Sequence, residues 1–137
     1  MNTNVGRNYL ENEVYSAPKC KLIIMLYDKI LQSLRAGKEF LKNKDLVGAH
    51  NNILKSESII MELMIHLNMK AGKISKNLYQ LYEFILWKLK EANIKKSIVE
   101  IEEVYNIIVE LKEAWEKVLL SEIKVENRHM ENVNLSI

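Results

Sequence analysis

The sequence is poor in the residues that interrupt helices. It contains one proline and four glycines in 137 residues, and no segment shows the alternation of apolar and polar residues that strands require. Glycine and proline are the strongest local signals of turns, so their scarcity favours long helices with few breaks. We therefore expect an all-α protein.

The sequence also lacks the features of secreted, membrane and nucleic-acid-binding proteins. A single cysteine, Cys20, excludes a disulfide within the chain and fits a reducing compartment. The N-terminal residues MNTNVGRNYLENE have no apolar core like that of a signal peptide, and no apolar run is long enough to span a bilayer. The net charge is only +2 and the basic clusters are short, which argues against nucleic acid. We expect a cytoplasmic protein without membrane insertion.

No group of residues has the pattern of a catalytic or metal centre. Helical di-metal proteins need paired Glu-x-x-His motifs, and the single match here, Glu126 to His129, lies in the polar C-terminal segment. Glu62 and His66 are four residues apart, and His50 has no acidic or nucleophilic neighbour. We expect no enzyme activity and no cofactor. The alternative, a metal-dependent helical enzyme, would be tested by elemental analysis.

Apolar residues recur at spacings of three and four in four segments, which is the period of a helix with one buried face. Short polar links near residues 43–45, 68–75 and 93–97 separate these segments, and short links make neighbouring helices antiparallel. The sequence predicts an antiparallel up-down four-helix bundle over residues 16–120. An N-terminal arm (residues 1–15) precedes it, and a mobile, disordered polar tail (residues 121–137) follows.

Three of the four segments carry more apolar residues than one buried stripe needs. These are LIIMLY at residues 22–27, IIMELMIHLNM at 59–69 and LYQLYEFILWKL at 78–89. One interpretation is a large core, and another is a homodimer. Taken together, the surplus favours an exposed apolar groove, because such patches usually mark an interaction site and methionine side chains adapt to a partner. An amphipathic helix or extended segment would fill this groove.

We name ten candidate partner-binding residues. Tyr9 and Val14 lie in the arm, which we expect to cover the groove when the partner is absent. The others are expected to line the surface itself, and they are Leu22, Met25, Ile60, Met64, Leu67, Tyr82, Ile85 and Leu86.

Five motifs, in the same order, resemble the family of the flagellar secretion chaperone FliS. Tyr9 precedes VYSAPKCKL (residues 14–22) and MLYDKIL (25–31), which resemble the family's V-x-T-A-[ST]-P-x-x-L and M-L-Y-[DN]-G-A-L. IIMELMIHLN (59–68) and LYEFILWKLKEAN (81–93) follow, and then EEV (102–104) with AW (114–115). The chain departs from the family pattern at Pro18-Lys19, Lys29-Ile30 and Trp87-Lys88, which indicates an altered client surface without affecting the fold.

The resemblance implies a non-enzymatic, cytoplasmic chaperone of the flagellar type III export pathway. Such a protein binds the disordered C-terminal segment of flagellin, prevents premature polymerisation and delivers the subunit for export. Components of the export apparatus would be further partners, and the protein would be a monomer or a weak dimer. The alternative is a self-associating helical-bundle protein without a flagellin client.

Overall fold

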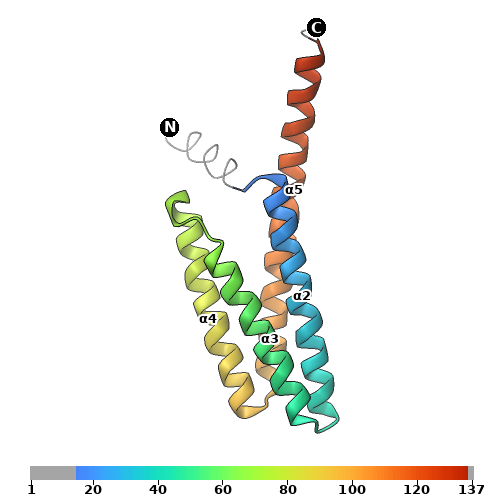
Figure 1. Cartoon of the computed structure of the whole chain (residues 1–137), viewed down its shortest axis with the longest axis vertical. Helices are drawn as coiled ribbons and strands as arrows, with labels where there is room; N and C mark the ends of the chain where they lie inside the picture. Colours follow the sequence, from blue (N-terminus) through green and yellow to red (C-terminus); the bar gives the residue numbers. More distant parts are fainter. Residues whose placement is uncertain (1–14, 136–137) are drawn as a thin grey trace.

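A computed structural model of the protein describes residues 15–135 (Figure 1). This part of the chain forms the helices α2 (Ala17–Lys42), α3 (Leu46–Ile65), α4 (Lys73–Lys95) and α5 (Ile98–Leu135). A single 3-10 turn, η1 (Met69–Ala71), lies between α3 and α4, and residues 15–135 contain no strand. The predicted all-α helical bundle is confirmed.

The helices pack in a closed ring. α2 contacts α3 and α5, and α4 contacts the same two helices from the other side. Each helix contributes one stripe of side chains at spacings of three and four to the centre, and complete burial of one aliphatic side chain stabilises the fold by about 1.5–3 kcal/mol. The centre includes Ile30, Leu34, Ile53, Ile60, Ile85, Leu89, Ile101 and Ile108.

The links between helices have clear local causes. Asp45 caps α3, because its carboxylate accepts a hydrogen bond of 2.9 Å from the backbone N–H of Gly48. Gly72 precedes α4 with a φ of 91°, a conformation in which a side chain would be strained. Lys96 ends α4 in the left-handed region. Each reversal therefore takes only a few residues, and successive helices run antiparallel.

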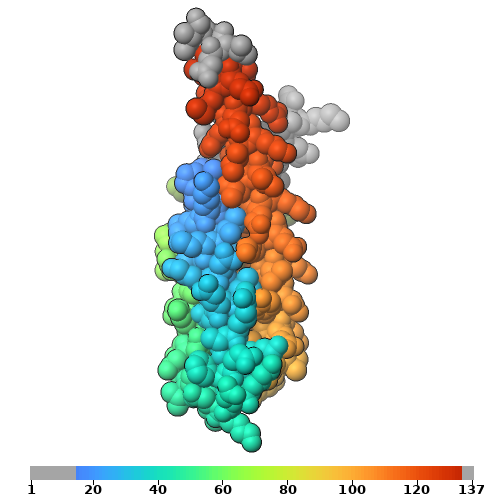
Figure 2. Space-filling model, turned by 90° about the vertical axis from the view of Figure 1, so that its right-hand side faces the viewer, coloured from blue at the N-terminus to red at the C-terminus, as the bar shows by residue number. Residues whose placement is uncertain are grey.

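Where the sequence predicts a disordered tail from residue 121, the structure instead continues α5 as a helix to Leu135. Its 38 residues would measure about 57 Å at 1.5 Å per residue. No glycine or proline follows Gly72, and most residues of the segment tolerate helix. Glu122 is the last buried residue, and all side chains from Lys124 to Val133 are exposed. α5 therefore projects beyond the other helices (Figures 1 and 2).

Ion pairs join α5 to both of its neighbours. Glu102 contacts Lys38 of α2 at 2.7 Å, and the adjacent Glu103 contacts Lys88 of α4 at 2.6 Å. These groups are exposed to solvent, which screens their charges, so each pair contributes little to stability. The pairs help to orient α5 between α2 and α4, whereas the apolar core supplies most of the stability.

Candidate functional site

The outer face of α3 carries a second apolar stripe. Val47, Leu54 and Met61 are spaced by seven residues, which places them on one side of the helix. Ile65 follows Met61 by four residues on the same side. Val47 is 71% exposed and Ile65 is 79% exposed. The inner stripe of α3, which includes Ile53, is buried, so α3 is apolar on two sides, and within residues 15–135 only one of them is covered.

An open groove lies between the end of this stripe and α4. It is lined by Met61, Met64 and Ile65 of α3 and by Tyr79 of α4, and its volume is ≈ 430 Å³. Its lining carries no charged side chain. Methionine side chains are flexible and polarizable, so this groove can adapt to apolar groups of different shapes.

A smaller pocket of ≈ 40 Å³ lies on the α2 side of α3. Its lining includes Leu22 of α2, Leu67 at the end of α3 and Trp115 of α5. Leu67 lies three residues after Met64, so the pocket and the groove adjoin the same end of α3. Together they form a mostly apolar surface with side chains from α2, α3 and α4, which also includes Lys19 and His66 at the pocket. We call its apolar part the partner surface, and it comprises Leu22, Met61, Met64, Ile65, Leu67 and Tyr79.

Five of the predicted residues are at least partly accessible. Leu22 and Met25 are exposed on the first turns of α2, and Met64, Leu67 and Leu86 are half-buried. Of these, Leu22, Met64 and Leu67 belong to the partner surface. Tyr9 and Val14 lie outside the described residues.

Three predicted groove residues are instead core residues. Ile60, Tyr82 and Ile85 are at most 1% exposed, although Tyr82 also lines the small pocket beside Leu22 and Leu67. Ile60 follows the buried Ile53 by seven residues, and Ile85 precedes the buried Leu89 by four. They therefore lie on the inner stripes of α3 and α4.

Tyr15, which we assigned to the arm, is an anchor of the bundle. It is 3% exposed, and its hydroxyl lies 2.7 Å from Oγ of Ser75 at the start of α4. Its ring meets that of Trp115 of α5 edge-on, with centroids 4.9 Å apart. Its carbonyl oxygen accepts a hydrogen bond of 3.3 Å from the thiol of Cys20. Tyr15 precedes the N-cap Ser16 and pairs with Cys20 as in a hydrophobic staple, a signal that the sequence contained.

The core also contains a pair of tyrosine hydroxyls. Tyr27 of α2 and Tyr82 of α4 lie with their hydroxyl oxygens 2.6 Å apart, and both residues are buried. Burial raises the pKa of Tyr27 to about 12. Burial, with Tyr27 beside it, also raises the pKa of Tyr82. Both phenols are therefore neutral at physiological pH, and one hydroxyl donates to the other inside the apolar core. Tyr27 also has a side-chain hydrogen bond with Trp115 of α5.

The polar groups considered as candidates for chemistry have structural surroundings. Residues 15–135 contain no group of three His, Cys, Asp or Glu side chains arranged to hold a metal ion. His50 hydrogen-bonds Asn93 and so joins α3 to α4. Cys20 is buried, and this burial raises the pKa of its thiol, which makes it a poor nucleophile. Among the described helices, none has the length and apolar character needed to cross a membrane.

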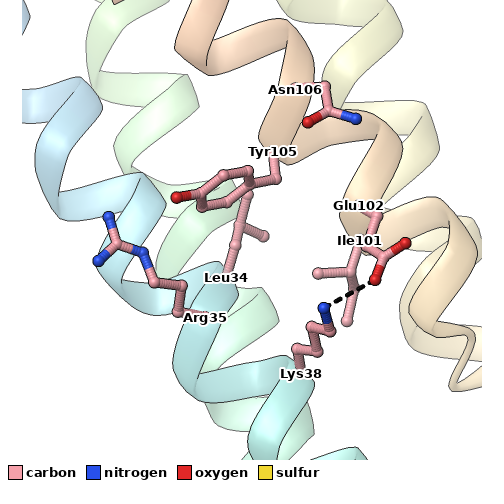
Figure 3. A pocket seen from close by; sticks show the side chains of 7 residues that line it. All are labelled: Leu34, Arg35, Lys38, Ile101, Glu102, Tyr105 and Asn106. Carbon is pink, nitrogen blue, oxygen red and sulfur yellow. Dashed lines mark ion pairs between the residues drawn. The ribbon is translucent and has the colours of Figure 1, made fainter.

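A third hollow, between α2 and α5, is charged (Figure 3). Its volume is ≈ 360 Å³. Lys38 and Glu102 form an ion pair across it, and the guanidinium of Arg35 lies over the ring of Tyr105 at 5.6 Å. The hydrogen bond with Lys38 lowers the pKa of Glu102. This hollow does not match the apolar groove that the sequence predicted.

Comparisons with known proteins agree on one family. The family model described as "Flagellar protein FliS" matches residues 1–122. The chain is 30% identical over 121 residues to a protein of Bacillus subtilis named flagellar secretion chaperone FliS, covering 88% of this chain and 89% of the relative. The proteins of the same name from Salmonella typhimurium (32% over 111 residues, 80% and 82% covered) and Campylobacter jejuni (31% over 120 residues, 86% and 94% covered) are similar. The chain belongs to the FliS family of flagellar secretion chaperones, which are not enzymes.

Proposed function

We propose that this protein binds the C-terminal segment of flagellin in the cytoplasm, prevents its premature polymerisation and delivers it for export. Its membership in a family of flagellar secretion chaperones supports the export role. The partner surface is the observation that carries the proposal, because it provides an uncovered apolar face and an apolar groove of ≈ 430 Å³ without a catalytic arrangement beside them.

The mechanism is folding of the client coupled to binding. Ordering each client residue costs about 1–2 kcal/mol of backbone entropy, whereas burying one large apolar side chain contributes about 1.5–3 kcal/mol. Binding is therefore favourable only when many apolar side chains of the client are covered. The partner surface extends over three helices, and the outer stripe of α3 from Val47 to Ile65 adds length to it. A client segment held along this surface cannot use the same side chains to polymerise.

The N-terminal arm has a regulatory part in this proposal. Tyr9 and Val14 compete with the client for the partner surface, so the arm protects this surface until the client arrives. The position of Tyr15 supports the idea, because Tyr15, which directly follows Val14 in the sequence, lines the pocket next to Leu22 and Leu67.

Titration with the C-terminal segment of the organism's own flagellin tests the proposal. We expect saturable binding in calorimetry, a gain of helical circular dichroism, and a one-to-one complex in light scattering. The competing function is self-association through the outer stripe of α3, whose spacing of seven suits helix pairing. A tight dimer that ignores the flagellin segment would contradict the proposal and favour the second function.

A further inference from the structure

One end of the partner surface carries a cluster of lysines. Lys70 of η1 and Lys73 and Lys76 of α4 follow one another at intervals of three residues, and all three are exposed. Within residues 15–135, none of them forms an ion pair with a carboxylate. The first turn of α4 contains no acidic residue. Positive charge is therefore concentrated here without an internal partner.

The position of these lysines relates them to the apolar groove. η1 connects the end of α3, where Met64 and Ile65 line the groove, to the start of α4. Lys76 precedes the groove residue Tyr79 by three residues, which is one turn of helix. Glu83 follows Tyr79 by four residues, one turn in the other direction. On α4, the groove residue Tyr79 is therefore flanked by Lys76 toward the end of the bundle and by Glu83 in the other direction.

We infer that the groove receives a short amphipathic helix with an acidic end. Its apolar side chains pack against Met61, Met64 and Tyr79, and its carboxylates lie over Lys70 and the other two lysines. Complementary charge of this kind fixes the direction in which a helix docks and suppresses wrong partners. The inference rests on the proposed function, because it specifies the chemistry and the orientation of the segment bound at the same surface.

A pair of synthetic helical peptides tests this inference. Both carry leucines at spacings of three and four, and one ends in three glutamates where the other has glutamines. The protein variants are Lys70→Gln/Lys73→Gln/Lys76→Gln and a control that removes the same charge elsewhere, Lys44→Gln/Lys117→Gln/Lys124→Gln. The control lysines are exposed and form no ion pair within the described residues.

We expect the unaltered protein to prefer the acidic peptide about tenfold, as three exposed charge pairs permit. The variant of Lys70, Lys73 and Lys76 loses the preference for the acidic peptide, whereas the control variant keeps it. Added salt reduces the preference of the unaltered protein. Equal affinity for both peptides, or the same loss in the control, overturns the inference. Stronger binding of the unaltered protein to phosphatidylglycerol vesicles than to either peptide, lost in the same variant, overturns it as well, because the cluster would then serve a membrane.

The flagellin segment separates this inference from the proposed function. If the segment binds the unaltered protein and the variant of Lys70, Lys73 and Lys76 equally well, the proposed function stands and the inference fails. If the segment does not bind at all but the acidic peptide is preferred, the inference stands as a property of the groove and the proposed function fails.

Discussion

The anchor formed by Tyr15 yields a quantitative prediction for the end of the bundle. Tyr15→Phe and Ser75→Ala each leave one buried hydroxyl without the partner that lies 2.7 Å away. We expect each variant to be destabilised by about 1–2 kcal/mol. The double variant removes both hydroxyls, so it should be less destabilised than the sum of the two by about 1 kcal/mol. Tyr15→Ala also removes the ring from Trp115 and should lose about 3–5 kcal/mol.

Equilibrium unfolding in urea measures these differences, provided that the slope m is the same in all variants. Tyr79→Phe is the matched control, since Tyr79 is 38% exposed and its change should stay within about 0.5 kcal/mol. Binding of an apolar dye to folded Tyr15→Ala should increase, because the pocket beside Leu22 and Leu67 enlarges. Strict additivity of Tyr15→Phe and Ser75→Ala would refute the coupling, and an unchanged stability of Tyr15→Ala would refute the anchor.

Three further predictions concern the surface, the arm and the core. Ile65→Glu should weaken binding of the flagellin segment at least tenfold in calorimetry without changing stability, because Ile65 is exposed at the groove. Val99→Glu on α5 is the control, and an equal loss of affinity in both variants would contradict the role of the groove. Deleting residues 1–14 should speed association in stopped-flow fluorescence, and unchanged kinetics would exclude a covering arm. Tyr27 has its pKa raised to about 12 from an ordinary value of about 10, and the pKa of Tyr82 is raised too. The two tyrosines should therefore contribute fully to the free energy of unfolding below about pH 10, and this contribution should be lost toward pH 12. Urea titrations measure the fall in stability over this pH range, and the fall should be smaller in Tyr27→Phe/Tyr82→Phe.

The periodicity of the sequence was sufficient for the bundle but not for the choice between core and surface. A spacing of three and four identifies a helix face, and it applies equally to the buried stripe through Ile60 and to the exposed stripe through Met61 and Ile65. Only the packing of α3 against α2 and α4 distinguishes the two. This is why Ile60, Tyr82 and Ile85 were predicted as groove residues and proved to be core.

Two other differences have local physical causes. Tyr15 precedes the first helix, where no periodic pattern applies, and its partners Ser75 and Trp115 are distant in sequence. The end of α5 lacks a buried face, so its polar composition resembled a disordered tail although most of its residues tolerate helix. A helix without a buried face is indicated only weakly by the propensities of its residues, whereas a helix with a buried face is indicated strongly by its apolar periodicity.

The hydroxyl pair of Tyr27 and Tyr82 has a consequence for how faithfully the bundle assembles. Aliphatic core residues such as Ile30, Ile60 and Leu89 are similar in size, so helices that slide by one turn find almost equally good packing. Such a slip moves a helix by about 5.4 Å, which would separate two hydroxyl oxygens that now lie 2.6 Å apart. The Tyr82 hydroxyl would then be buried without this partner, at a cost of about 1–3 kcal/mol. One polar contact thus sets the register of α2 against α4 and disfavours slipped bundles that the aliphatic core alone would tolerate.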